Sequence, residues 1–169
     1  MIILPVSFDF YKLMFCGKAA IMEIERKFLV KELPDLTGTV MIRMEQRYLS
    51  TDPVLRIRKA DDKHIFTYKS GMGMVRQEEE FEISAEDYAK LCEKTIGHPV
   101  AKTRYVMELP DGHHAEIDVY HGRLDGLLVV ETEFGSEEEA NAFVPPVWFG
   151  TEVTDDPYYT NAMLAFKEA

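Results

Sequence analysis

The sequence predicts an α+β protein in which eight antiparallel strands form one curled sheet, with helices packed outside it. Eight segments alternate in side-chain character with period two, which is typical of strands. Nearly every segment has one ionic and one apolar face, and Asp111-Gly112 is a tight hairpin signal between two of them. The 169 residues suit a single domain, for which roughly 100–200 residues is usual, and 46% apolar residues are enough for a packed core.

The predicted strands follow one another without a repeat or a linker. They span residues 22–30, 40–49, 54–60, 64–69, 74–83, 99–109, 114–120 and 127–134. Asp111-Gly112 connects the sixth and seventh strands, while Gly71 and Gly73 indicate a looser turn between the fourth and fifth.

Three helices are predicted from capping signals at their starts, where a polar side chain can accept a hydrogen bond from a free backbone N–H. The signals are Ser84 with Asp87, Ser136 with Glu139, and Asp156 before Pro157. The last signal places a proline at the first helical position, so we expect a C-terminal helix that continues through Leu164 and Phe166.

The first twenty-one residues differ from the rest of the chain. They are apolar, but Asp9, Lys12 and Lys18 interrupt them, and no uninterrupted run approaches the ~20 residues of a membrane span. We expect residues 1–21 to be an extension upstream of the true start, with Met22 as an alternative start. A poor signal peptide is the weaker alternative. Residues 22–169 would then form the domain.

Charge and cysteine content exclude several classes of protein. The chain has 19 Lys+Arg against 30 Asp+Glu, a formal charge of −11. This argues against nucleic-acid and anionic-membrane partners, which require a basic surface. Cys16 and Cys92 form no CxxC pair, so a thiol-redox motif is excluded and a cytoplasmic protein is expected.

Charged side chains share one face of most predicted strands, because residues i and i+2 project to the same side. These faces hold Glu23, Glu25 and Lys27; Arg43, Glu45 and Arg47; Arg56 and Arg58; Arg76, Glu78, Glu80 and Glu82; Lys102 and Arg104; Glu116 and Asp118; Glu131 and Glu133. In the second strand, Ile42, Met44 and Tyr48 are expected on the opposite, apolar face.

Two interpretations of the ionic face are open. It could be the solvated side of an open sheet, with salt bridges between neighbouring strands. However, it is rich in Arg and Glu, poor in neutral polar residues, and places like charges together. Paired carboxylates need a cation such as Mg²⁺ or Mn²⁺ between them, and closely set arginines favour a phosphate. A lumen that holds a metal ion and a compact polyanion would explain both the paired carboxylates and the closely set arginines. The sequence contains no GxxxxGK[ST] phosphate-binding loop.

An ordered set of motifs resembles the CYTH, or triphosphate tunnel metalloenzyme, superfamily. Glu23-Ile24-Glu25-Arg26-Lys27 is similar to its ExExK motif. The family order continues through EIERKFLV (23–30), LRIRK (55–59), TYKSG (67–71), RQEEEFEI (76–83), KTRY (102–105), EIDVY (116–120), VETEF (130–134) and EVTDDPYYTNAMLA (152–165). The resemblance covers residues 22–167.

The resemblance implies an eight-stranded antiparallel barrel that binds triphosphate in its lumen. By the resemblance, the metal ligands are Glu23, Glu25, Glu131 and Glu133, with Asp118 as an accessory ligand. The residues that bind phosphate would be Lys27, Arg56, Arg58, Lys69, Arg76, Lys102 and Arg104. Catalysis would depend on Glu23, Glu25 and Lys27. Glu78 and Glu80 match further lumen acids, which would position basic neighbours or a second metal.

The implied activity is metal-dependent hydrolysis of the terminal phosphate of inorganic triphosphate, with Mg²⁺ or Mn²⁺. Nucleoside or thiamine triphosphatase, class IV adenylate cyclase and a non-catalytic polyphosphate-binding module are the alternatives, and a homodimer is open. One residue departs from the family pattern: Arg47 stands in EQRYLS where a glycine is expected. Arg47 could add a phosphate contact or crowd the lumen, or pair with Glu45 near the rim.

Overall fold

A computed structural model describes residues 21–70 and 74–168. Within these ranges the chain forms nine strands, three α-helices and two 3₁₀ turns. The strands are β1 (Ile21–Val30), β2 (Val40–Thr51), β3 (Val54–Ala60), β4 (Lys63–Ser70), β5 (Val75–Glu82), β6 (Ile96–Glu108), β7 (His114–Tyr120), β8 (Leu128–Glu133) and β9 (Phe149–Glu152). The helices and turns are α1 (Ala85–Cys92), η1 (Gly122–Leu124), α2 (Glu137–Ala142), η2 (Pro157–Tyr159) and α3 (Asn161–Leu164).

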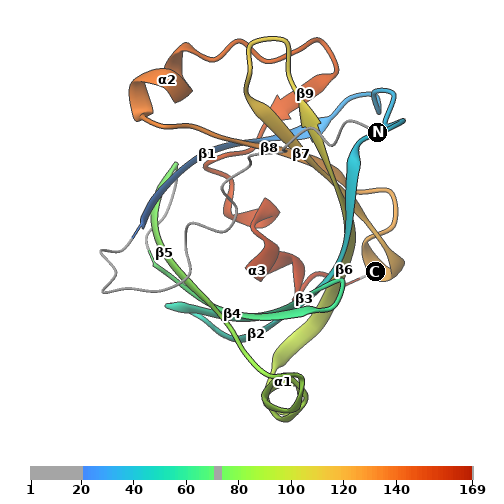
Figure 1. Ribbon diagram of the computed structural model, residues 1–169, viewed down its shortest axis with the longest axis vertical. Helices are drawn as coiled ribbons and strands as arrows, with labels where there is room; N and C mark the ends of the chain where they lie inside the picture. The colour runs from blue at the N-terminus through green and yellow to red at the C-terminus, as the bar shows by residue number, and fades with distance from the viewer. Residues whose placement is uncertain (1–20, 71–73, 169) are drawn as a thin grey trace, which may run out of the picture.

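The strands form one antiparallel sheet with the order β5-β4-β3-β2-β6-β7-β8-β1-β9. β1 has partners on both sides, since residues 21–24 pair with β5 and residues 25–29 pair with β8. The additional pairing of β1 with β5, the first strand in this order, brings β1–β8 into a ring, which Figure 1 shows. The expected antiparallel arrangement of eight strands is confirmed, and β9 is a short addition beside β1.

The strand register identifies the inner face of the ring, because residues directly opposite in an antiparallel pair project to the same side. Lys27 lies opposite Glu131, while Phe28 lies opposite Val130 on the other face. Phe28 and Val130 are buried in a cluster that includes residues of α2 and β9. Since α2 lies outside the ring, the face that carries Lys27 and Glu131 is the inner one (Figure 1).

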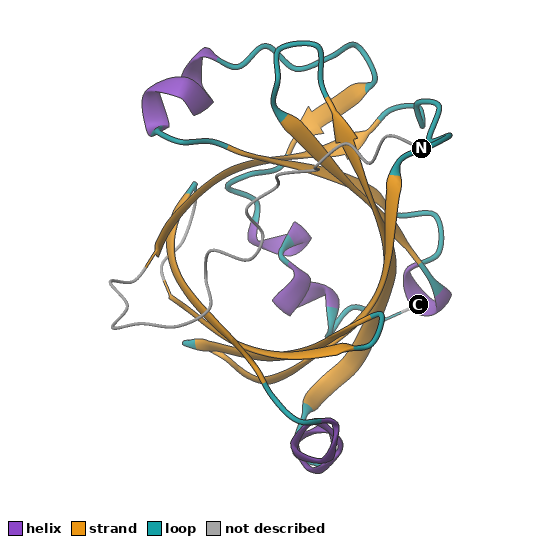
Figure 2. Ribbon diagram, in the orientation of Figure 1, coloured by secondary structure: helices purple, strands orange, loops and turns teal. Residues whose placement is uncertain are grey.

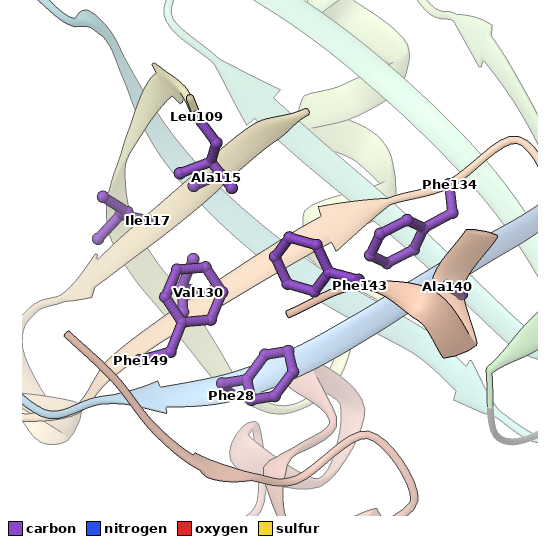
Figure 3. Packing of buried hydrophobic residues seen from close by; sticks show 9 residues of the cluster. All are labelled: Phe28, Leu109, Ala115, Ile117, Val130, Phe134, Ala140, Phe143 and Phe149. Atoms are coloured by element: carbon purple, nitrogen blue, oxygen red, sulfur yellow. The ribbon is translucent and has the colours of Figure 1, made fainter. Parts of the chain in front are cut away.

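The outer cluster forms the larger apolar core beside the ring. Its buried members are Phe28, Leu109, Ala115, Ile117, Val130, Phe134, Ala140, Phe143 and Phe149, and Figure 3 shows them between the strands and α2. Arg26, also on the outer face of β1, joins these parts. Its guanidinium donates to Glu152 at 2.7 and 2.8 Å and to the Ala140 and Phe143 carbonyls at 2.9 and 3.1 Å.

α3 is placed differently from the other two helices. α1 and α2 lie outside the ring, as expected, whereas α3 appears within the ring outline when viewed along its axis (Figure 2). Leu164 of α3 is fully buried in a second cluster with Tyr48, Tyr120 and Val129, which are inner-face residues. The Tyr120 hydroxyl also donates to Asn161 Oδ1 at 2.6 Å. α3 therefore fills one end of the ring.

β2 has the opposite orientation from the one expected. Tyr48 lies opposite Arg56 of β3, so Tyr48 is on the inner face. The outer face consequently carries Arg43, Glu45 and Arg47. The prediction that these three residues share the ionic inner face is wrong, because register with β3 sets the orientation and local charge density does not. Arg47 Nε instead donates to Glu45 Oε1 at 2.9 Å, the pairing that was one of the alternatives.

The C-terminal helix is shorter and more broken than expected. Asp156 does cap a turn, accepting from Tyr158 N at 3.0 Å, but η2 ends at Tyr159. Thr160 then caps α3, where its hydroxyl accepts from Met163 N at 3.3 Å. β9 was not expected at all. None of the helices formed by the described residues is long and apolar enough to cross a membrane.

Candidate functional site

Charged side chains cover much of the inner face in two groups. The β6–β8 wall is the group Lys102, Arg104, Glu116, Asp118 and Glu131, together with Lys27 of the adjacent strand β1. The β3–β5 wall is the group Arg56, Arg58, Lys69, Glu78 and Glu80. Glu23 and Glu25 of β1 lie where the two walls meet, because β1 pairs with both β5 and β8.

The β6–β8 wall is organised around Asp118, which has no exposed surface. Its carboxylate accepts from Arg104 Nε and Nη2, both at 2.8 Å, and pairs with Lys102. Arg104 also pairs with Glu116 and donates from Nη2 to Glu131 Oε2 at 2.7 Å. Each charge on this wall therefore has an opposite charge beside it within the protein.

Burial and these partners shift the pKa values of the wall in opposite directions. Burial, reinforced by Arg104, lowers the pKa of Lys102 to about 8. Burial alone would raise the pKa of Glu131, but Lys27 and Arg104 outweigh it and hold that pKa well below the ordinary value. Lys27 Nζ lies 2.7 Å from Glu131 Oε1, so Glu131 is an ionised partner for two bases.

The β3–β5 wall is organised around Glu80. Glu80 Oε1 accepts from Arg56 Nη2 and Arg58 Nη2, each at 3.0 Å, and Arg58 Nη2 is also 3.0 Å from Oε2. The Thr67 hydroxyl donates to the same Oε1 at 2.8 Å. One carboxylate thus holds two arginines of β3 at once.

Glu78 links the same wall to β1. Glu78 Oε1 accepts from Arg56 at 3.1 Å, and Oε2 lies 2.8 Å from Lys69 Nζ, which also pairs with Glu23. Burial would raise the pKa of Glu78, but Arg56 and Lys69 outweigh it and lower that pKa below the ordinary range. Lys69 is therefore shared between β5 and the ExExK strand.

One carboxyl group of β1, Glu23, and one of β8, Glu133, have raised pKa values, so their surroundings favour the protonated form. Glu25 lies directly opposite Glu133 in the register. Burial and then Glu25 raise the pKa of Glu23 to about 8, although Lys69 opposes the shift. Burial, Glu116 and Glu25 raise the pKa of Glu133 to about 7. As they stand in the described residues, no three acidic, His or Cys side chains are gathered closely enough to hold a metal ion.

The structure brings together the described side chains that were predicted to form the site. These are Glu23, Glu25, Lys27, Arg56, Arg58, Lys69, Lys102, Arg104, Asp118, Glu131 and Glu133. The backbone of Arg76 lies opposite Glu23, but its side chain is outside the described part of the structure. Arg47, on the outer face, is not part of the group.

Inner-face residues that were missed include Thr67, Gln46 and Tyr48, and Ile42 and Met44 of β2 lie on the same face. Thr67 could have been found, since it alternates with Lys69 on β4 and so shares its face. Tyr48 and Gln46, whose Nε2 donates to the Tyr48 hydroxyl at 3.0 Å, were hidden by the reversed orientation of β2. Gln46 is fully buried, and its Oε1 has no hydrogen-bond partner among the described residues.

Comparisons with known proteins agree on one family. The family model described as the CYTH domain matches residues 22–143. An inorganic triphosphatase of Nitrosomonas europaea is 46% identical over 149 residues, covering 86% of this chain and 97% of that protein. An inorganic triphosphatase of Acetivibrio thermocellus is 34% identical over 149 residues, covering 84% and 92%. A crystal structure of an inorganic triphosphatase superposes with a TM-score of 0.67 at 43% identity, covering 89% of this chain and 98% of the other.

Proposed function

Because this chain belongs to the CYTH domain family, we propose that it hydrolyses the terminal phosphate of inorganic triphosphate with the help of a divalent metal ion. One observation carries the proposal: the inner face of the ring places basic side chains on both walls around the carboxylates of β1 and β8. Such an arrangement can neutralise a compact polyanion and a cation together. The 46% identity to an inorganic triphosphatase supports this substrate over other polyanions.

The basic residues would bind the phosphate groups. Arg56 and Arg58 present guanidinium groups from neighbouring inner positions of β3, and guanidinium donors fit phosphate oxygens in pairs. The other members of the set are Lys27, Lys69, Arg76, Lys102 and Arg104. Arg104 is held by three carboxylates, so it would act from a fixed position.

The carboxylates of β1 and β8 suit a hard divalent cation, for which we propose Mg²⁺ or Mn²⁺. Burial, and after it the neighbouring carboxylates, raises the pKa values of Glu23 and Glu133, and a bound cation would oppose both shifts by favouring the ionised carboxylates. Glu23, Glu25 and Glu133 would have to move closer together to hold the ion, because no three acids of the described residues are gathered closely enough as they stand. Glu131 and Asp118 would have to share their oxygens with the bases that they already contact. A bound ion would polarise phosphate oxygens and lower the pKa of a bound water molecule.

The residues proposed for catalysis are Glu23, Glu25 and Lys27. The two glutamates would fix the position of the cation relative to the phosphate chain. Lys27, whose Nζ lies 2.7 Å from Glu131, would place a positive charge beside the carboxylates of β8 and stabilise negative charge that develops on the phosphate. A cytoplasmic location and a homodimer remain predictions.

The test is phosphate release from tripolyphosphate, ATP and thiamine triphosphate with Mg²⁺ or Mn²⁺, beside an assay for cyclic AMP. We expect tripolyphosphate to have the highest kcat/KM and release to stop when EDTA removes the metal. Faster turnover of ATP or thiamine triphosphate would reassign the substrate. No turnover of any compound would leave a polyphosphate-binding module.

A further inference from the structure

Glu80 occupies the position from which a phosphate oxygen would contact Arg56 and Arg58. Its Oε1 lies 3.0 Å from the Nη2 atoms of both arginines, and its two oxygens straddle Arg58 Nη2 at 3.0 Å. This spacing is the ordinary one for a charge-assisted hydrogen bond between guanidinium and carboxylate or phosphate oxygens. The donors proposed to bind substrate are therefore already engaged by an anion that belongs to the protein.

We propose that Glu80 is an internal competitor of the substrate, which the phosphate chain must displace from Arg56 and Arg58. Glu80 thereby sets the affinity of the site for polyphosphate. This inference rests on the proposed function and deepens it, since it assigns to Glu80 the opposite effect from the neighbouring bases.

The two walls differ in a way that makes displacement feasible at Glu80. The Glu80 side chain is 30% exposed, so it can turn towards solvent without entering an apolar region. Asp118, the corresponding acid of the β6–β8 wall, has no exposed surface, and its displacement would separate the buried Lys102 from its ion-pair partner, although Arg104 would keep Glu116 and Glu131. A carboxylate that water can rehydrate can be replaced by a phosphate group at its arginine partners, whereas a carboxylate that must stay desolvated keeps its position.

A partner in the wall gives Glu80 a defined resting position. The Thr67 hydroxyl donates to Oε1 at 2.8 Å, and Thr67 lies opposite Arg56 of β3 and opposite Glu80 of β5 on the same face. Arg58 Nε is buried with no hydrogen-bond partner among the described residues, so Arg58 retains donor capacity that Glu80 does not use. An incoming phosphate with three or four oxygens could satisfy both arginines and this remaining N–H, which Glu80 cannot do with two oxygens.

The experiment is calorimetric titration of the full chain with inorganic triphosphate in EDTA, where the proposed reaction does not proceed. The near-isosteric Glu80→Gln should bind triphosphate at least about tenfold more tightly than the wild type, because the competing charge is removed. Thr67→Val should shift affinity in the same direction by less, because it removes the hydrogen bond that holds Glu80 but also the hydroxyl that accepts from Arg56 Nη2 at 3.2 Å.

Two matched variants separate displacement from a general change in charge. Glu79→Gln alters the outer face of β5, and Glu82→Gln alters the exposed inner-face residue at the end of the same strand. Each should change the affinity for triphosphate by less than about twofold. Thermal unfolding should be similar in all variants, which would establish that the substitution at Glu80 has not disturbed the strand. A crystal structure with triphosphate should show Glu80 away from both arginines.

Weaker or unchanged binding by Glu80→Gln would overturn the proposal, as would equal tightening by Glu82→Gln. Either result would leave the proposed function intact, because phosphate release by the wild type with metal tests that independently. If wild type binds and Glu80→Gln binds more tightly, but neither hydrolyses tripolyphosphate, the competitor role stands and the proposed activity fails. Absence of binding in both proteins would also overturn the competitor role.

Discussion

The two walls of the inner face use the same residue types, but one ion pair on each wall differs from the other in burial. On the β6–β8 wall, the Lys102 and Asp118 side chains are 2% and 0% exposed. On the β3–β5 wall, Arg58 and Glu80 are 14% and 30% exposed. Removing one member of a fully buried ion pair leaves the other charge buried without a partner, whereas a partly exposed charge can be rehydrated. The Lys102–Asp118 pair should therefore contribute mainly to folding, and the Arg58–Glu80 pair mainly to exchange of ligands.

The carboxylates where the walls meet should show the largest effect. Glu25→Ala should reduce metal-dependent phosphate release at least about a thousandfold, because it removes a proposed cation ligand that lies opposite Glu133. Release from tripolyphosphate at saturating Mg²⁺ measures this, with circular dichroism as the control for folding. Wild-type rates in the variant would defeat the metal assignment.

Asp118→Asn should give the largest loss of stability on either wall. It leaves Lys102 and Arg104 facing a neutral amide inside the protein, so we expect a loss of about 3–5 kcal/mol in the free energy of unfolding. Urea denaturation measures the loss. Glu80→Gln is the matched variant on the β3–β5 wall, where we expect a loss of about 1 kcal/mol or less in the free energy of unfolding. Equal losses would remove the distinction between the walls.

Arg58→Ala tests whether the β3–β5 wall binds the phosphate chain. It should weaken binding of tripolyphosphate by about 1.5–3 kcal/mol, roughly ten- to a hundredfold, through loss of charge-assisted hydrogen bonds. The unfolding free energy should change less than in Asp118→Asn. Calorimetric titration gives the affinity, and an unchanged affinity would show that the β3–β5 wall does not bind the phosphate chain.

The smallest expected effect lies outside both walls, at His113 in the turn after β6. Partial burial would lower the pKa of His113, but hydrogen bonds to Asp111 and Glu139 outweigh it and raise the net pKa above 6.5. A raised pKa in the folded state stabilises the protein fully below the unfolded value of 6.5, and that contribution is lost as pH rises through the folded value. His113→Gln should therefore lower the free energy of unfolding by about 0.2–1 kcal/mol at pH ~5.5 and by much less at pH ~8.5.

Urea denaturation of the wild type and the His113→Gln variant at the two pH values measures this difference. Tripolyphosphate hydrolysis should be unchanged, since His113 contacts Asp111 and Glu139 away from the inner face. A stability difference that does not depend on pH would assign His113 to packing against Phe134 and Phe143 instead.

Most of the strands could be predicted because alternation along a strand is a local property. β3 and β7 were predicted with the bounds that the structure has, and the hairpin at Asp111-Gly112 was placed correctly. β9 could not be found this way, since its four residues are too few to establish a period and it is positioned by pairing with β1. The C-terminal helix was overextended because Thr160 restarts the capping pattern inside it.

Membership of the site was more predictable than the arrangement within it. Charge patterns identified the residue types, and the resemblance assigned their roles, but only the register shows which strand faces which. Tyr48 was assigned outwards because Arg43, Glu45 and Arg47 offered a charged alternative. Pairings such as Glu80 with Arg56 and Arg58 join residues more than twenty positions apart, and no periodicity within one strand contains that information.

α3 gives the ring a direction. Leu164 packs against Tyr48, Tyr120 and Val129 at one end, whereas Glu82 remains exposed on the inner face away from that cluster. A phosphate chain bound on the inner face would therefore enter and leave by the end opposite α3, and this end would admit both the substrate and the water molecules that hydrate it.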